Sequence, residues 1–378
     1  MYTMTGLDPK DGKPIEITVR DGIIHAMNAG RGHEEQWLSR GFVDLQVNGY
    51  GGDDVNMDEP DSHAIISLTA KMIAAGVTTY LPTITTASEG KITAALRAIA
   101  RARQSSKLVA GCVPCVHVEG PHISPLEGYR GAHPVEHVRP PDLAEFARWQ
   151  QASGGLVGMV TLSPHFAGSD AYISGLVALG VHVSIGHTHA SAEEIRKAVD
   201  AGARLSTHLG NGMPGMIPRH RNSIWTQLSE DRLTATLIAD GHHLPGDTIK
   251  AMVRAKGIDR SILVSDSVAL AGLPPGTYDA PIGGEVELHS DGRLCLVGTE
   301  YFAGAGLPLK DGIARAMSLA GISLGESIQM ATANPGRFAG GAGIMQIGMP
   351  ADLVRFSIEG GGSGLRIERV LVKGKEWS

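Results

Sequence analysis

Residues 112–120 read CVPCVHVEG, a short apolar run that ends in a glutamate, and this stretch decides how the rest of the chain is interpreted. Three further apolar runs end in a histidine or an aspartate: VHVSIGH at 181–187, ARLSTH at 203–208 and ILVSD at 262–266. Short apolar runs bounded by loops are typical of strands buried in a parallel sheet. In a (β/α)8 barrel the functional side chains lie at the carboxyl ends of the strands, around one opening. The four runs therefore predict a site at the mouth of such a barrel, built from Glu119, His187, His208 and Asp266.

The order of elements along the chain supports the barrel. Apolar runs alternate with segments of helical periodicity such as SHAIISLTAKMIAAG and SAEEIRKAVDAG. Regular alternation of strands and helices implies a parallel sheet, and eight repeats close it into a barrel. We expect strands at 41–47, 77–83, 112–119, 156–163, 181–187, 203–209, 233–240 and 261–266.

Both ends of the chain have a different pattern. PIEITVRDGIIHAM, from residue 14, alternates apolar and polar residues around Asp21-Gly22, which is a strong signal for a β-hairpin. The tail from Ala351 returns to short alternating strands, with GGGSG at 360–364 as a hairpin loop. We therefore predict an α/β fold with two parts. Residues 41–342 form a TIM-like metal-dependent hydrolase barrel, and residues 1–40 and 343–378 together form a small β-sandwich domain.

Composition narrows the range of partners. The 378 residues carry a net charge of −6 with scattered Lys and Arg, so no basic stripe suggests nucleic acid or an anionic membrane as a partner. No apolar run is long enough to cross a bilayer, and the N-terminus lacks the features of a signal peptide. Three cysteines are too few for a disulfide framework, and Cys112 and Cys115, placed in an expected strand, are interpreted as buried thiols. We expect a cytoplasmic protein.

The chemistry of the four strand-end residues points to a metal. A catalytic divalent cation such as zinc takes about three protein ligands and keeps one position open for water. Glu119, His187 and His208 offer suitable donors, and Asp266 could accept a proton from the bound water. Any one of these residues alone is more often an ordinary loop residue, and only the joint pattern favours a site. His189, in the H-x-H with His187, is interpreted as a surface or capping residue.

Several longer motifs resemble one known family. The chain reads GFVDLQVNGYGG from 41, VHVEGPHIS from 116, GAHP from 131, VSIGHTHAS from 183, STHLGNGMP from 206, LIADGHHL from 237 and LVSDSVALAG from 263. In this order they resemble the signatures of N-acetylglucosamine-6-phosphate deacetylases, which are members of the amidohydrolase superfamily. The resemblance runs from about Gly41 to Asp352. It implies a metal-dependent hydrolase that releases acetate and glucosamine 6-phosphate from N-acetylglucosamine 6-phosphate.

The resemblance also assigns the reacting groups. It implies that Glu119, His187 and His208 bind the metal and that Asp266 is the general base and then the general acid. Superfamily members with two metals carry H-x-H at the end of the first barrel strand, where this chain reads Gln46-Val47-Asn48. Neutral amides are poor ligands for such cations, so we expect one divalent metal per subunit. Zinc fits this site best, and Fe²⁺, Co²⁺ and Ni²⁺ suit the same ligands.

The remaining assignments concern the substrate. The resemblance implies that His133 lies over the amide or the sugar and that His243 contacts the substrate. It implies that the backbone at Asn211 and Gly212 cradles the phosphate, and that Arg219 reaches the phosphate from the partner subunit. The expected partners are thus a small phosphorylated amino sugar and, in a homodimer, a second copy of the chain.

Two departures from the family pattern leave the substrate open. The loop at 297–310 carries extra glycines and the pair Tyr301-Phe302, and Gly210 and Gly212 stand where the family commonly has Phe and Ala, which predicts a wider site. One alternative is therefore another N-acetylated amino sugar phosphate, such as N-acetylgalactosamine 6-phosphate, or another N-acyl substrate. A second alternative is a non-catalytic binding protein, which the complete ligand set disfavours.

Overall fold

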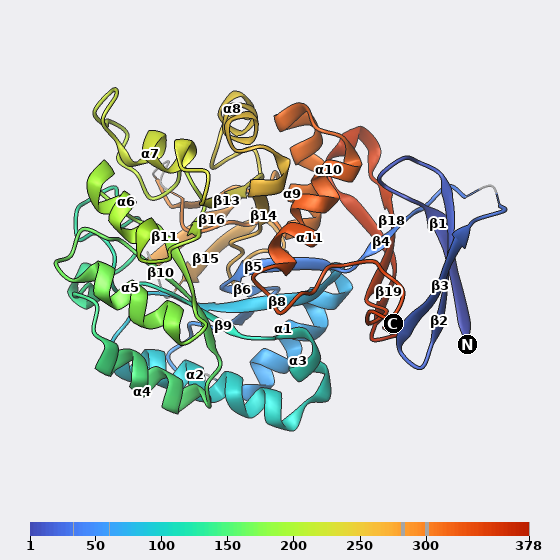
Figure 1. Ribbon diagram of the computed structural model, residues 1–378, viewed down its shortest axis with the longest axis horizontal. Coiled ribbons are helices and arrows are strands. Elements are labelled where there is room, and N and C mark those ends of the chain that lie inside the picture. The colour runs from blue at the N-terminus through green and yellow to red at the C-terminus, as the bar shows by residue number, and fades with distance from the viewer. Residues whose placement is uncertain (33, 60, 281–283, 299–301, 378) are drawn as a thin grey trace.

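A computed structural model describes every residue of the chain except 33, 60, 281–283, 299–301 and 378. Its centre is one eight-stranded sheet in which neighbouring strands are parallel and follow each other in chain order (Figure 1). The predicted barrel is confirmed. Its strands are β5 (Phe42–Val47), β8 (Val77–Ile84), β9 (Val116–Glu119), β10 (Val157–Leu162), β11 (His182–Ile185), β12 (Leu205–Ser206), β13 (Thr234–Ile238) and β14 (Ser261–Val264).

Strand β9 shows why these runs are buried on both faces. Val116 and Val118 belong to the large hydrophobic core that the surrounding helices cover. Successive side chains of a strand point to opposite faces, so His117 and Glu119 point to the inside of the barrel. His117 there contacts Thr161 Oγ1 at 2.7 Å. In such a strand, every second side chain therefore points into the barrel, and the others pack against the helices.

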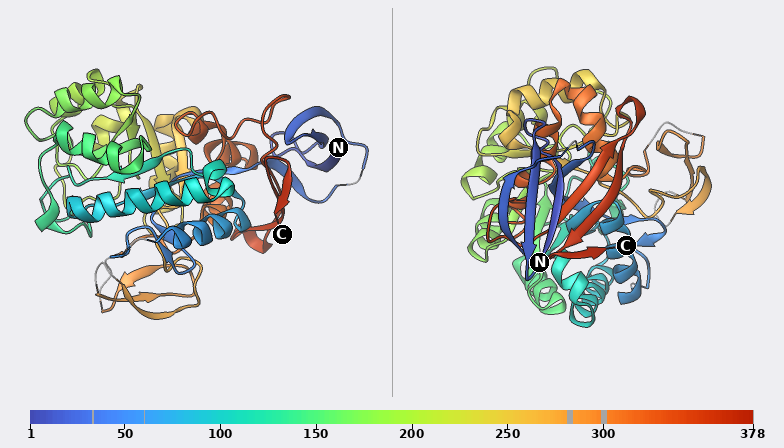
Figure 2. Two further views of the ribbon diagram at one scale, coloured as in Figure 1. Left: turned by 90° about the horizontal axis from the view of Figure 1, so that it is seen from below. Right: turned by 90° about the vertical axis from the view of Figure 1, so that its right-hand side faces the viewer.

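Helices cover the outside of the barrel (Figures 1 and 2). Several begin at a side-chain cap, for example α6, where Ser191 and Glu194 form a reciprocal capping box. The helices are α1 (Ser62–Ala74), α2 (Glu89–Ser105), α3 (Lys107–Cys112), α4 (Leu143–Ser153), α5 (Ser169–Ala178), α6 (Ala192–Asp200), α7 (Ser223–Ser229), α8 (Gly246–Lys256), α9 (Leu309–Ala316), α10 (Leu324–Met330) and α11 (Ala333–Gly336), with a π-helical turn at Met317–Gly321.

The last barrel strand meets the first one at the mouth. No ladder joins β14 to β5 along their length in the described residues. Just beyond β14, the Asp266 amide donates to the Gln46 carbonyl at 3.0 Å, and the Asn48 amide donates to the Ser267 carbonyl at 2.9 Å. These bonds draw the two strand ends together, so the candidate base Asp266 is held by the first strand of the barrel.

The two ends of the chain form a separate seven-stranded sheet. It contains β1 (Tyr2–Leu7), β2 (Pro14–Arg20), β3 (Ile23–Ala29), β4 (Trp37–Arg40), β18 (Leu353–Ile358), β19 (Leu365–Val372) and β20 (Lys375–Trp377). The hairpin at Asp21-Gly22 is present, and residues from both ends share one core, for example Ile17 and Leu371. Figure 2 shows this sheet at one end of the molecule. The domain boundaries at 40/41 and 342/343 stay a prediction.

Two sequence interpretations need correction or addition. Cys112 was expected in a strand but ends helix α3, which Ser106 caps, and the strand begins only at Val116, after Pro114. Both Cys112 and Cys115 are free, with Cys112 buried and Cys115 partly buried. A three-stranded antiparallel sheet was not expected at all: β15 (Gly276–Ala280), β16 (Gly284–Leu288) and β17 (Leu294–Leu296). Its apolar side packs on Val268 and Leu270, just after Asp266. Short strands β6 (Gly49–Tyr50) and β7 (Asp53–Asp54) form a further pair.

Within the described ranges of the chain, none of the helices combines the length and the apolar character that a membrane crossing requires.

Candidate active site

Backbone strain marks the mouth of the barrel. Among the described residues other than glycine, five have a positive φ, and three of them are His187, His208 and Asp266, at 46°, 26° and 50°. A side chain in this left-handed region is unfavourable, and such strain is retained mainly where function requires it. Each of the three lies two residues beyond the end of a barrel strand, and all three line one cavity. The sequence predicted these positions, but not the strained turns that hold them.

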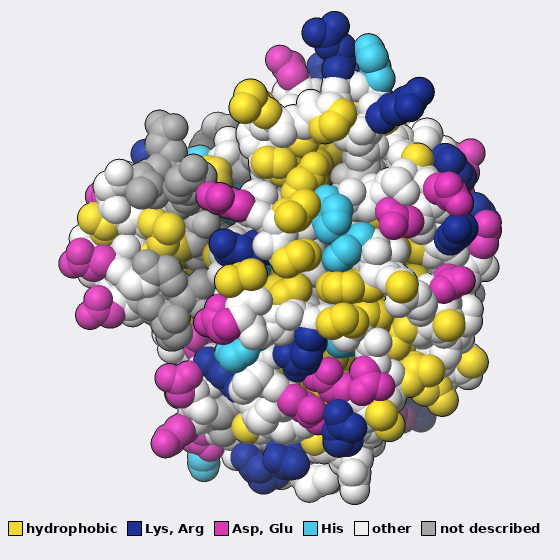
Figure 3. All heavy atoms as spheres, turned by 90° about the vertical axis from the view of Figure 1, so that its left-hand side faces the viewer, with side chains coloured by type: hydrophobic (Ala, Val, Ile, Leu, Met, Phe, Trp, Pro, Cys, Tyr) yellow, Lys and Arg dark blue, Asp and Glu magenta, His cyan; other side chains and the backbone are white. Residues whose placement is uncertain are grey.

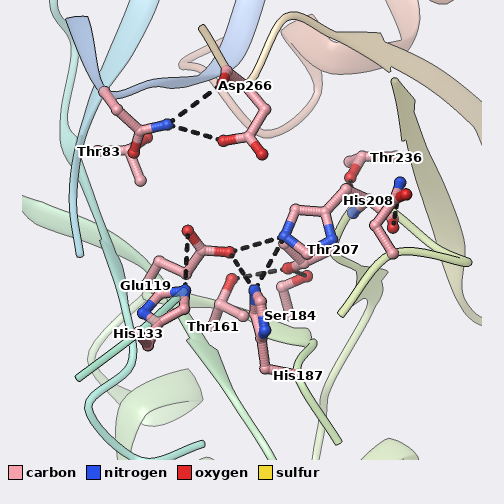
Figure 4. A network of polar contacts seen from close by, with 12 residues as sticks. Thr83, Glu119, His133, Thr161, Ser184, His187, Thr207, His208, Thr236 and Asp266 are labelled. Carbon is pink, nitrogen blue, oxygen red and sulfur yellow. Dashed lines mark hydrogen bonds and ion pairs between the residues drawn. The ribbon is translucent and has the colours of Figure 1, made fainter. Parts of the chain in front are cut away.

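Glu119, His187 and His208 converge on one point (Figure 4). Glu119 Oε1 lies 2.9 Å from His208 Nε2 and 3.4 Å from His187 Nε2, and the two imidazole nitrogens are 3.2 Å apart. In a tetrahedral site with metal–ligand bonds near 2.05 Å, ligand atoms are about 3.3 Å from each other. The three donor atoms therefore already have the spacing of one face of such a site. A divalent cation fits this donor set.

Outer contacts orient two of the histidines. His187 Nδ1 donates to the Tyr129 carbonyl at 2.9 Å, which leaves the Nε2 lone pair directed at the cluster. His133 Nδ1 contacts Thr86 Oγ1 at 2.8 Å. Donor atoms of Glu119, His133 and His187 all lie within 4.8 Å of each other, so His133 is a rival ligand. Its Nε2 is 4.0 Å from Glu119, farther than the 2.9 Å of His208, and geometry favours His208.

The cluster keeps its charges although it is buried. Burial alone would raise the pKa of Glu119, but its contacts with the His187 and His208 imidazoles hold that pKa well below its ordinary value. Burial would lower the pKa of His208, yet its contact with Glu119 raises it to about 9. An imidazolium thus sits beside a carboxylate where a cation would bind. Metal binding there would displace this proton.

Asp266 is held by the first barrel strand. Asn48 Nδ2 donates to Asp266 Oδ1 at 2.7 Å, so this neutral amide holds the carboxylate by a hydrogen bond. Burial raises the pKa of Asp266 to about 6, and the nearby Glu119 carboxylate adds to the effect. Gln46 Nε2, by contrast, is buried without a hydrogen-bond partner among the described residues. A carboxyl group that titrates near neutral pH suits proton transfer.

His243 has a partner that the sequence analysis missed. Its Nδ1 donates to Asp240 Oδ2 at 2.6 Å, while Asp240 Oδ1 accepts from the backbone amides of His242 and His243. Asp240 lies two residues beyond the end of strand β13, a position like those of His187, His208 and Asp266. Phe302 stacks on the His243 ring, with centroids 4.6 Å apart. Its neighbour Tyr301, also singled out from the sequence, lies outside the described residues.

The phosphate candidates are only partly brought together. Asn211 and Gly212 line the cavity, and the Asn211 side chain donates to the His208 carbonyl at 3.2 Å. Arg219 is exposed and does not line the cavity of its own chain. The neighbouring Met216 and Trp225 are exposed as well, at 92% and 55%.

The predicted widening at the two glycines is wrong. A Cβ at Gly212 would lie 2.7 Å from His187 Nδ1, and one at Gly210 would lie 2.9 Å from Met252 Cε. Other side chains therefore fill the space that larger residues would take. Gly212, with φ of 60°, lets the backbone approach the histidine ring.

The cavity has a volume of about 400 Å³, within the range of small-molecule sites. Figure 3 shows the face of the molecule opposite the seven-stranded sheet, with histidine side chains near its middle among hydrophobic ones. Apolar and polar groups share the lining. Asp54, Val268, Leu270, Phe302 and Ala303 belong to it together with the residues described above.

Comparison with known proteins places this site in a family. The profile of the amidohydrolase family matches residues 37–377. The chain belongs to the amidohydrolase family. This amidohydrolase is 31% identical over 354 residues to an N-acetylglucosamine-6-phosphate deacetylase of Bacillus subtilis (strain 168), covering 89% of the chain and 87% of the relative. The resemblance to that deacetylase family is thereby confirmed.

Two further relatives sharpen the comparison. An N-acetylgalactosamine-6-phosphate deacetylase of Escherichia coli O157:H7 is 30% identical over 365 residues, covering 95% of this chain and 94% of the relative. The crystal structure of N-acetyl-D-glucosamine-6-phosphate deacetylase from Mycobacterium smegmatis superimposes with a TM-score of 0.87 at 27% identity, covering 99% of this chain and 98% of that one. Relatives of similar identity thus act on two epimeric sugars.

Proposed function

We propose that this amidohydrolase removes the acetyl group from N-acetylglucosamine 6-phosphate by hydrolysis of the amide. The observation that carries the proposal is the convergence of Glu119, His187 and His208 at the barrel mouth, in one cavity with Asp266. Relatives named for this reaction match nearly the full chain. The strained backbone at His187, His208 and Asp266 also marks the mouth as a functional site.

Glu119, His187 and His208 would hold one divalent cation. Zinc suits two imidazoles and a carboxylate best, and Fe²⁺, Co²⁺ or Ni²⁺ are the alternatives that the same donors accept. When bound, such a cation polarises a carbonyl and makes its water more acidic. Tyr129 supports the arrangement, because its carbonyl fixes the His187 ring.

Asp266 would carry the proton. Its carboxylate first accepts a proton from the attacking water and then gives it to the departing amine, so one residue serves as base and acid. Asn48 donates to Oδ1 and thereby holds the carboxylate in place. His133, which burial keeps neutral by lowering its pKa to about 3, would face the acetyl amide or the sugar.

The sugar and its phosphate would lie toward the cavity wall. His243, oriented by Asp240, offers Nε2 to a sugar hydroxyl. The backbone at Asn211 and Gly212 would cradle the phosphate, and Arg219 of the partner subunit would reach it in a homodimer. Two observations support the dimer: Arg219 is exposed on its own chain, and Met216 and Trp225 beside it expose apolar surface. A guanidinium binds phosphate with a fixed fork of donors.

N-acetylgalactosamine 6-phosphate is the second candidate substrate. The E. coli relative named for that substrate is as similar to this chain as the glucosamine enzymes are. The two sugars differ only in the orientation of one hydroxyl. Phe302, stacked on His243 in the divergent loop, is placed to distinguish them.

The test measures acetate release from both 6-phosphates and from unphosphorylated N-acetylglucosamine, using protein stripped with a chelator and then reloaded with zinc. We expect turnover of the glucosamine 6-phosphate to depend on the metal and on the phosphate. Faster turnover of the galactosamine epimer would make that epimer the substrate, while the proposed deacetylation would stand. No acetate from any of the three compounds would contradict the proposal.

A further inference from the structure

A second cavity of about 200 Å³ lies far from the mouth, at the end of the barrel where the strands begin. Arg40 precedes β5, and Gly111 and Pro114 precede β9, so this basal cavity is at the amino ends of the strands. The terminal sheet forms its other wall, with Asp352 just before β18 and Lys373 just after β19. It is therefore enclosed by both parts of the molecule.

Arg40 is the central feature of the basal cavity. Its Nη1 is buried and has no hydrogen-bond partner, and its side chain forms no ion pair in the described part of the chain. Burial lowers its pKa to about 9, which still leaves the guanidinium charged at neutral pH; Asp8 compensates only from a distance. The Arg40 side chain as a whole is half-buried, and a partly desolvated charge without a counterion still costs free energy, which a bound anion would remove.

Lys373 supplies a second positive charge at the rim. Its Nζ lies 3.1 Å from the point where a Cβ of Gly111 would stand, so the ammonium group is at the cavity wall. No carboxylate of the described residues lies within ion-pair distance of it. The acidic residue of the wall is Asp352, whose Oδ1 accepts from the Lys373 backbone amide at 2.6 Å. The lining of the cavity therefore contains two basic residues and one acidic residue.

The rest of the wall leaves room for a ligand. The segment Ala339–Gly343 reads AGGAG, and Gly340, Gly341 and Gly343 have φ of 69°, 78° and 71°. A Cβ at Gly341 would meet nothing within 4 Å. A Cβ at Gly343, by contrast, would clash with the Thr332 carbonyl oxygen, so the open part of this wall is at Gly341.

We propose that the basal cavity binds a small phosphate-bearing anion between the Arg40 guanidinium, the Lys373 ammonium and the glycine segment 340–343. A guanidinium and an ammonium together match the several oxygens of a phosphate group, which a single planar carboxylate does not offer. With half the volume of the mouth cavity, about 200 against about 400 Å³, the site takes free phosphate or a short phosphate ester. Such a ligand bridges the barrel and the terminal sheet.

The experiment counts the inorganic phosphate bound to the full-length, metal-loaded protein by equilibrium dialysis with labelled phosphate. Lys373→Gln should lower the phosphate affinity of one class of sites about tenfold, since a charged hydrogen bond is lost. The matched control is Lys375→Gln, an exposed lysine two residues along the same hairpin. Arg219→Ala, which affects the mouth, should leave this class unchanged. Arg40→Gln should abolish it, with thermal unfolding used to confirm that the variant folds.

Two results separate the outcomes. Phosphate binding that is equal in wild type, Lys373→Gln and folded Arg40→Gln would overturn the proposal, because all bound phosphate would then be elsewhere. If the Lys373-dependent class is present, repeating the titration with glycerol 3-phosphate identifies the ligand source. Tighter binding than inorganic phosphate indicates a phosphate ester, and weaker binding indicates the free ion.

Discussion

The mouth of the barrel and the interior just beneath it both bury ionisable side chains, but they treat charge in opposite ways. At the mouth, contacts with the His187 and His208 imidazoles overcome burial and hold the pKa of Glu119 well below its ordinary value. In the interior, burial raises the pKa of Asp44 to about 7 and lowers that of His117 to about 4. The Glu119–His208 pair at the mouth keeps its charges, whereas burial shifts Asp44 and His117 in the interior toward their neutral forms.

Neighbours, not depth, make this difference. His117 and Glu119 are two residues apart on one strand and equally buried, at 2% and 3% exposure. His117 contacts the Leu45 carbonyl and Thr161, which are neutral groups, while Glu119 contacts two imidazoles. Asp44 Oδ1 accepts from the backbone amides of Gln46 and Ser265, and its Oδ2 has no hydrogen-bond partner in the described structure. Charge at the mouth is therefore a property of a few specific pairs.

Among the substitutions that test this view, Asp266→Asn should have the largest effect. Asparagine preserves the shape but accepts no proton at neutral pH, so kcat should fall by about 10²- to 10⁴-fold. The metal content, measured by atomic emission, should stay at the wild-type value because Asp266 is not needed as a ligand. Turnover within threefold of wild type would show that another group carries the proton.

Gly212→Ala tests whether the close approach of the Gly212 backbone fixes the His187 ring. A Cβ at this position would lie 2.7 Å from His187 Nδ1, so the ring would have to move away from Glu119. Metal affinity should fall about 10- to 100-fold, as it does when outer contacts of metal ligands are lost. Competition with a chelator measures this.

Gly215→Ala is the matched control, because a Cβ at Gly215 meets nothing within 4 Å. Equal metal affinity in Gly212→Ala and Gly215→Ala would mean that the His187 ring is not fixed by this approach.

Asp240→Asn asks whether the pairing of His243 matters for the substrate. The Asn Oδ1 still accepts from the His242 and His243 amides, but Nδ2 no longer accepts from the His243 ring. The ring loses its preferred tautomer, and KM should rise about tenfold, the effect of one charge-assisted hydrogen bond. Steady-state kinetics separates KM from kcat. A change in kcat alone would place His243 in the chemical step instead.

Much of this arrangement was predictable from the sequence, and the misses have physical reasons. Glu119 ends its strand and His187, His208 and Asp266 lie two residues beyond the ends of theirs, so order along the chain implied closeness in space. The contact of His187 with Tyr129 is made by a backbone carbonyl from a distant loop, for which no side-chain pattern exists.

Other misses came from local signals that compete with each other. The strand expected to begin at Cys112 starts at Val116, because the Ser106 cap favours a helix over 107–112. The sheet β15–β17 has short strands beside glycines, which resemble loop sequence. Asp240 also stands at the end of an apolar run, but a histidine beside it, His243, matched the family pattern, and Asp240 itself was not predicted.

Asp44→Asn gives the smallest and most specific test of the comparison. The folded protein binds a proton at Asp44 up to about pH 7, while the unfolded chain releases it near the ordinary value of 3.8. A carboxyl pKa that is raised on folding contributes stability that is fully present below about pH 3.8 and is lost progressively until the pH has risen through about 7. Between about pH 6 and pH 8, wild type should therefore lose roughly 1 kcal/mol more unfolding free energy than Asp44→Asn, as measured by urea denaturation. Asparagine keeps the Oδ1 acceptor for both backbone amides and never ionises, so the difference isolates the charge. Parallel pH profiles in the two proteins would mean that the interior tolerates a carboxylate as readily as the mouth does, and the contrast between the two regions would be lost.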